Sequence, residues 1–182
     1  MDKRADIVSG AASAFEADCF RGAGIDKVLA PSGASTRTLY KHFGSKEGLV
    51  LAVLEERHRR FEERLEAAAK GADAVAALFD TLRQWLEEHG ARGCMLLRAR
   101  AEYSGASEEI VDLVRRQKSA FRRRVAARVE AALGREDDSL ATQIWLLFEG
   151  ATAAASVADL SVVNAAKAAA ASLVEEAKRN AC

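Results

Sequence analysis

The amino-acid sequence predicts an all-α fold of about nine helices. Apolar residues recur at the three- and four-residue spacing of an amphipathic helix along most of the chain. The 182 residues include a single proline, Pro31, and many alanine, leucine, glutamate and arginine residues, which are strong helix formers. We find no convincing β-strand pattern. Together these three observations favour a helical protein large enough to bury a substantial core.

The first two helices are expected before Pro31. The first helix runs from about Asp2 to Asp18, where apolar residues recur at helical spacing. Asp26 can cap a second helix that extends to Leu29 or Ala30. Pro31 then ends that helix, because proline lacks a backbone N–H and its ring crowds the preceding turn. The second helix should therefore be short or kinked.

Two further helices follow a turn at Gly33. Ser35 can cap a helix over residues 36–42, which Gly44 ends. Ser45 can cap the fourth helix, which should reach Lys70 and Gly71. The segment from Ile25 to Lys46 thus predicts a helix-turn-helix, with the helix after Ser35 as its recognition helix.

Five more helices are expected after Gly71. Asp73 opens the fifth, and Cys94–Tyr103 forms a sixth that should be buried, since its first residues are nearly all apolar. Ser107 begins a long seventh helix that Gly134 stops. The last two helices cover about Ser139–Val157 and Val162–Arg179.

The predicted recognition helix has two chemically different faces. Leu39 and Phe43 are four residues apart and should face inward. The outward residues carry hydroxyl groups, an aromatic ring and positive charges, and no acidic residue occurs between Ser35 and Lys46. Such a face suits contact with phosphates and base edges. An amphipathic helical hairpin with ordinary surface residues is the alternative interpretation.

The segment Thr38–Leu49, TLYKHFGSKEGL, resembles the signature of the TetR family of bacterial transcriptional regulators. The resemblance implies an N-terminal three-helix helix-turn-helix DNA-binding domain over residues 1–53 and a C-terminal helical effector-binding and dimerisation domain over residues 54–182. It depends on about a quarter of the chain, and Pro31 departs from the alanine that most members carry. By analogy, the DNA-contacting residues would be Thr36, Arg37, Thr38, Tyr40, Lys41, His42 and Lys46.

Large and polar side chains of the C-terminal helices could line an effector pocket, although each is more commonly a core residue. The candidates are Trp85, Met95, Tyr103, Gln117, Phe121, Trp145 and Phe148. Their apolar character favours a hydrophobic effector.

The last two helices have broad faces of small residues, and the resemblance makes them the dimer interface. The predicted interface residues are Leu140, Ile144, Leu147, Ala151, Val163, Ala166, Ala170 and Leu173. The alternative is that these residues close the core of the monomer.

Other functional classes find little support in the sequence. The cysteines Cys19, Cys94 and Cys182 lie far apart, and no metal-ligand spacing or catalytic motif occurs. Asp159 and Lys167 interrupt the most apolar stretch, so no membrane association is expected. The sequence thus predicts a cytoplasmic, ligand-responsive repressor that binds double-stranded operator DNA as a homodimer. It is expected to need no cofactor or metal and to have no enzymatic activity. A helical small-molecule-binding protein without DNA-binding activity is the alternative.

Overall fold

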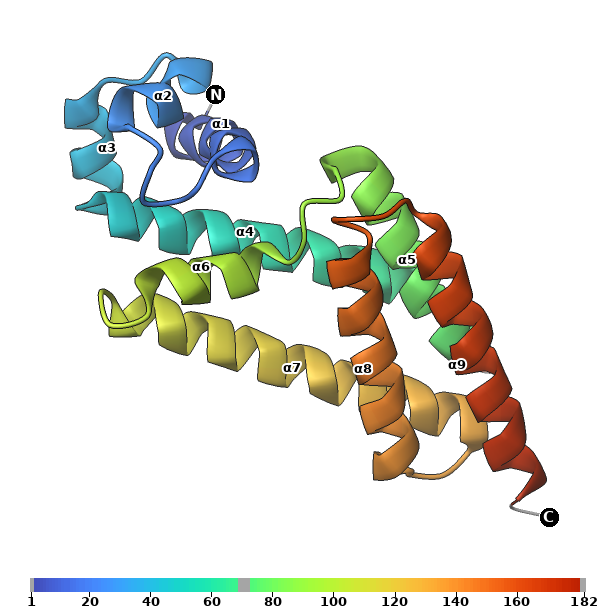
Figure 1. Cartoon of the computed structure of the whole chain (residues 1–182). Helices are drawn as coiled ribbons and strands as arrows, with labels where there is room; N and C mark the ends of the chain where they lie inside the picture. The colour runs from blue at the N-terminus through green and yellow to red at the C-terminus, as the bar shows by residue number, and fades with distance from the viewer. Residues whose placement is uncertain (1, 69–72, 181–182) are drawn as a thin grey trace. The chain divides into compact units, whose positions relative to one another are not determined.

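The computed structural model describes residues 2–68 and 73–180, and it confirms the all-α prediction (Figure 1). Within these ranges the chain forms nine α-helices and one 3-10 turn, with no strand. The elements are α1 Lys3–Ala17, α2 Ile25–Leu29, η1 Ala30–Ser32, α3 Thr36–Phe43, α4 Lys46–Ala67, α5 Ala74–His89, α6 Met95–Tyr103, α7 Glu108–Leu133, α8 Asp138–Ala154 and α9 Ser161–Arg179. The predicted end of the fourth helix, Lys70–Gly71, lies outside the described residues.

The chain divides into two compact units. Unit 1 contains Met1–Arg60 and Met95–Arg116, and unit 2 contains Phe61–Cys94 and Gln117–Cys182. Helices α4 and α7 therefore each contribute residues to both units. These units are defined by packing, whereas the division between residues 1–53 and 54–182 concerns function and stays a prediction.

Several helix ends are capped as the sequence predicts. The Oγ of Ser35 accepts a hydrogen bond from the backbone N–H of Thr38 at 3.2 Å, and Gly44 ends α3. The prediction for Asp26 is wrong, because α2 begins one residue earlier, at Ile25. Gly24 therefore occupies the N-cap position, without a side-chain hydrogen bond.

Pro31 lies in η1, where the chain tightens into a 3-10 turn directly after α2. The second helix is only five residues long, which confirms that it is short. Gly10 of α1 accommodates this turn, since a Cβ atom there would lie 3.0 Å from the Cβ of Pro31. Gly33 follows with φ of +60°, in the left-handed region that favours glycine.

Unit 1 has its own apolar core around the helix-turn-helix. Phe15, Phe20 and Leu39 are fully buried there, and α6 adds Met95, Ala99 and Tyr103. The expectation that α6 begins as a buried helix is wrong in one respect, because Leu97 is 46% exposed. The helix is amphipathic, with buried residues at four-residue spacing.

Unit 2 packs α5, α8 and α9 with the C-terminal parts of α4 and α7. Phe79, Val125, Ile144 and Ala170 belong to its core. The long α7 turns Gln117 and Phe121 inward, and both are buried. Among the described residues, none of the helices combines the length and apolarity that a membrane span requires.

Candidate nucleic-acid interface

Helix α3 presents one face to the core of unit 1 and the other to solvent. Leu39 is fully buried and Phe43 is partly buried, with the guanidinium carbon of Arg4 5.3 Å from the centre of its ring. Tyr40 is 50% exposed. The other exposed residues of this face are Thr36, Arg37, Lys41 and His42.

The start of α3 is held by paired hydroxyl groups. The Oγ of Ser35 lies 2.9 Å from the Oγ1 of Thr38 in addition to capping the backbone. Thr38 is partly buried, and its hydroxyl group contacts the N-cap residue of α3. The adjacent Thr36 and Arg37 have exposed side chains, so the first turn of α3 offers a hydroxyl group and a guanidinium group to solvent.

The outward face of α3 is positively charged. Its first turn contains no acidic residue, and its last turn contains Lys41 and His42. In the part of the chain that the structure describes, neither Arg37 nor Lys41 has an ionic partner. A helix with two unpaired cations on its exposed face can bind a polyanion without first breaking internal ion pairs.

Lys46 differs from the other predicted contacts. Its Nζ donates hydrogen bonds to the backbone oxygens of Arg21, at 3.2 Å, and Ala23, at 2.5 Å. Burial lowers the pKa of Lys46 below its usual value, against the opposite effect of Glu47 and Glu102. The ammonium group is therefore engaged inside unit 1, and a contact with DNA through Lys46 stays a prediction.

Comparison with known proteins identifies this region. The model of bacterial regulatory proteins of the tetR family matches residues 7–53, which contain most of α1, all of α2 and α3, and the start of α4. This match places residues 7–53, the helix-turn-helix segment, in the tetR family. SCO4454, a TetR-family transcriptional regulator from Streptomyces coelicolor, is 25% identical with a TM-score of 0.88 over 97% of this chain and 96% of that one.

More distant solved structures share the TetR fold. A TetR transcriptional regulator from Chloroflexus aurantiacus is 24% identical, with a TM-score of 0.81 over 96% of this chain and 94% of its own. A putative transcriptional regulator from Saccharomonospora viridis, solved in complex with choline, is 18% identical, with a TM-score of 0.76 over 94% and 95% of the two chains. No curated protein matches. The chain thus has the fold of a DNA-binding TetR-family regulator over nearly its whole length.

Three of the seven predicted effector-pocket residues meet in one aromatic cluster of unit 2. The ring centres of Phe121 and Phe148 lie 4.6 Å apart, and Phe61 lies 5.3 Å from Trp85 and 6.1 Å from both other rings. Phe61 was not among the predicted pocket residues. It lies on α4, and the helical spacing of apolar residues does not show which other helices a residue faces.

The other predicted pocket residues lie in different surroundings. Met95 and Tyr103 belong to the core of unit 1, where burial raises the pKa of the Tyr103 hydroxyl to about 12. The ring of Trp145 in unit 2 lies 5.5 Å from the guanidinium carbon of Arg122. Gln117 is 7% exposed, and its Oε1 has no hydrogen-bond partner among the described residues. Such a buried, unpaired acceptor is uncommon in folded proteins.

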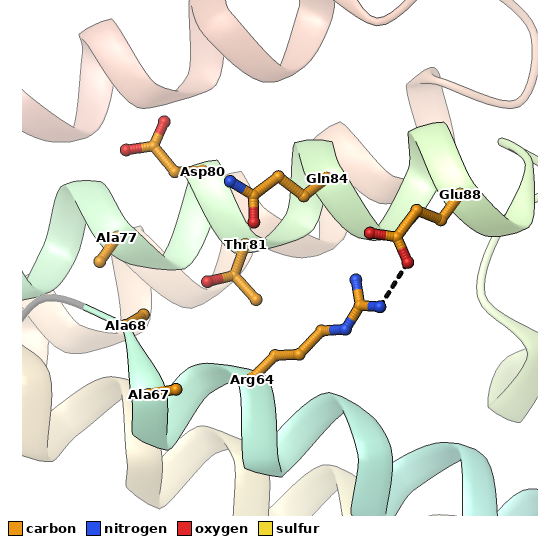
Figure 2. A pocket seen from close by; sticks show the side chains of 8 residues that line it. All are labelled: Arg64, Ala67, Ala68, Ala77, Asp80, Thr81, Gln84 and Glu88. Atoms are coloured by element: carbon orange, nitrogen blue, oxygen red, sulfur yellow. Dashed lines mark hydrogen bonds and ion pairs between the residues drawn. The ribbon is translucent and has the colours of Figure 1, made fainter.

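Unit 2 also has an open depression of about 420 Å³ between the end of α4 and α5 (Figure 2). Arg64 crosses it and forms an ion pair with Glu88, while its guanidinium carbon lies 5.1 Å from the centre of the Trp85 ring. The remaining lining residues are Ala67, Ala68, Ala77, Asp80, Thr81 and Gln84. None of the predicted pocket residues lines this depression.

Arg128 ties the same part of unit 2 together from α7. It donates hydrogen bonds to the backbone oxygens of Leu65, in the last turn of α4, and of Ala74, at the start of α5. Burial is the largest cause that lowers its pKa, with Arg124 acting in the same direction. Arg124 contacts Glu62 at 2.6 Å, so two arginines of α7 fix the end of α4.

The residues predicted for the dimer interface lie mainly inside unit 2. Leu147 and Leu173 are partly exposed, whereas the chain itself buries the other six. Those six residues pack α8 and α9 into the core of the monomer, as the alternative interpretation expects, and their role in a dimer interface stays a prediction. The outward side of α8 instead carries Ser139, Gln143, Leu146, Gly150 and Ala153, all exposed.

Proposed function

We propose that this protein is a ligand-responsive repressor of the TetR family that binds operator DNA through α3 and releases it when a small hydrophobic effector binds unit 2. The observation that carries the proposal is the division of α3 between a buried Leu39 and an exposed cationic face. A helix-turn-helix binds with its second helix in the major groove. The proposed contacts on α3 are Thr36, Arg37, Thr38, Tyr40, Lys41 and His42.

Arg37 is the proposed base-reading residue, because a guanidinium group can donate two hydrogen bonds to the O6 and N7 acceptors of guanine. The test begins with selection of a bound duplex from a random-sequence library. We expect Arg37→Ala to relax the preference at one position of each half-site and to weaken binding by about 5- to 150-fold. Arg116→Ala, which removes an exposed arginine of α7, is the control. An unchanged selected sequence with Arg37→Ala would refute this role.

We infer a homodimer in which the exposed side of α8 packs against the same side of a second copy. Ser139, Gln143, Leu146, Gly150 and Ala153 follow one another at alternating four- and three-residue spacing, which is the spacing of helices that pack along their length. Ala165, Ala169 and Ser172 of α9 are exposed in the same repeat. Two recognition helices about 34–36 Å apart, one helical turn of DNA, are what a dimeric helix-turn-helix protein needs to bind two half-sites.

The aromatic cluster of Phe61, Trp85, Phe121 and Phe148 supports a hydrophobic effector, since apolar rings with few polar groups are typical of small-molecule sites. A protein of the same fold has been solved with choline, so this architecture can hold a small molecule. The test is thermal melting with a panel of apolar aromatic compounds and with choline. A compound that raises the melting temperature should also release the selected duplex, as linkage requires.

A helical small-molecule-binding protein without DNA-binding activity is the alternative function. The unpaired cations of α3 argue against it, because such a protein has no need of them. Failure to enrich any duplex at low salt would favour the alternative.

A further inference from the structure

Lys46 joins the two ends of the helix-turn-helix. It begins α4, three residues after α3 ends at Phe43. Its Nζ donates hydrogen bonds to the backbone oxygens of Arg21 and Ala23, which lie in the turn before α2. A single ammonium group therefore connects the chain that enters α2 with the chain that leaves α3.

Charged side chains of α6 hold the same turn. The Oε2 of Glu102 accepts a hydrogen bond from the backbone N–H of Arg21 at 2.9 Å. Arg98 donates to the backbone oxygens of Phe15, at 3.1 Å, and Asp18, at 2.8 Å. With Lys46, three charged side chains satisfy backbone groups between residues 15 and 23. Besides its internal hydrogen bond from the backbone N–H of Ala23 to the oxygen of Cys19, the turn thus relies on side chains from outside it.

The hydrogen bond from Lys46 to Ala23 is partly buried, whereas the one to Arg21 lies at the surface. Ala23 is 2% exposed, so an unpaired carbonyl group there would be poorly solvated and costly. The lowered pKa of Lys46, caused mainly by burial, agrees with an ammonium group that is partly withdrawn from water. The two carbonyl groups occupy two of the three donors of the ammonium and hold it beside the turn.

We propose that Lys46 is a positioning residue, which fixes α3 by holding the turn before α2 against the start of α4 and does not itself bind a DNA phosphate. The inference rests on the proposed DNA-binding function. It separates Lys46 from Lys41, which lies on the exposed face of α3 and has no internal partner among the described residues.

The salt dependence of binding distinguishes the two roles. The plot of log K against log salt has a negative slope. Each lost phosphate contact reduces the magnitude of this slope by about 0.9, or by about 1.8 for a dimer with two copies. We expect Lys41→Met to lower the slope by about this amount and to leave the melting temperature unchanged. Lys46→Met should weaken binding by on the order of tenfold at every salt concentration, without that change in slope. Its melting temperature should fall by about 3–10 °C.

A second measurement uses the unaltered protein and does not depend on a variant that folds. Lysines are acylated with a small amine-reactive reagent, with and without the selected duplex, and the modified residues are identified by mass spectrometry. We expect Lys46 to react slowly in both states, whereas Lys41 reacts readily in the free protein and is protected by DNA.

The outcomes separate this inference from the proposed function. If Lys46 reacts as fast as Lys41 and is protected by DNA, or if Lys46→Met lowers the salt slope as Lys41→Met does, Lys46 contacts phosphate and the inference is overturned. If the unaltered protein binds no duplex, the proposed function fails. Rapid acylation of Lys46 in the free protein would then also show that its ammonium group is not held by the turn before α2, which overturns the inference.

Discussion

At the scale of single residues, neighbours along α3 have opposite environments. Leu39 is fully buried and Tyr40 is 50% exposed, as helical periodicity predicts. The engagement of Lys46 could not be predicted in the same way, because its partners Arg21 and Ala23 lie 25 and 23 residues earlier in the chain. Periodicity identifies the side of a helix on which a residue lies, but not the backbone oxygen that its side chain reaches.

Gln117 gives a prediction at this scale. Its buried Oε1 has no partner among the described residues, so replacing the amide with an apolar group of similar shape removes a desolvation cost. We expect Gln117→Met to raise the free energy of unfolding by about 1 kcal/mol in urea titrations. If the amide binds the effector, the same variant should respond more weakly to it.

Gln84→Met is the matched control, since Gln84 is exposed on α5 and should change stability by less than about 0.5 kcal/mol. A loss of stability in Gln117→Met would show that the amide makes a favourable interaction in the folded protein.

At the scale of elements, the sequence predicts the helix-turn-helix well and α6 less well. Local signals begin and end these helices: Ser35 caps α3, Gly44 ends it, and Pro31 lies in the 3-10 turn that follows α2. The burial of α6 depends on how it packs within unit 1. Its early apolar residues suggested a buried helix, yet Leu97 faces solvent. Composition alone does not determine which side of a short helix is covered.

Gly33 gives a prediction for the turn between α2 and α3. Its φ is +60°, and a Cβ atom would meet nothing within 4 Å, so a substitution is opposed by backbone conformation and not by a steric clash. We expect Gly33→Ala to lower the free energy of unfolding by about 1–2 kcal/mol, Gly33→Val by more and Gly33→Asn by less. Urea unfolding of the three variants measures this order. Equal losses for Asn and Val would contradict the conformational explanation.

At the scale of the whole molecule, the sequence predicts that α8 and α9 bury small residues but not which ones. On α9, Ala166 and Ala170 are buried while Ala165 and Ala169 are exposed. With alanines on every side of the helix, the apolar pattern does not distinguish the core from an outward face. Only the packing of α8 and α9 in the folded chain shows which of their sides is buried. Most of the predicted dimer residues lie on that buried side.

Leu146 tests the proposed dimer. It is 56% exposed at the middle of the outward face of α8, so Leu146→Asp should leave the folded monomer intact and place a charge in the interface. We expect light scattering to show a shift towards monomer, together with weaker binding of a two-half-site duplex. Arg116→Asp on α7 is the control. A variant that remains fully dimeric at low micromolar concentration would exclude this face as the interface.

Only a small part of α3 packs into the core, and this affects how the DNA preference of such a protein can evolve. Of its eight residues, Leu39 alone is fully buried, and the cap comes from Ser35 outside the helix. New outward side chains can therefore be introduced with little penalty in folding. Target preference can diverge by mutation, or be retargeted by design, while the scaffold that carries it stays the same.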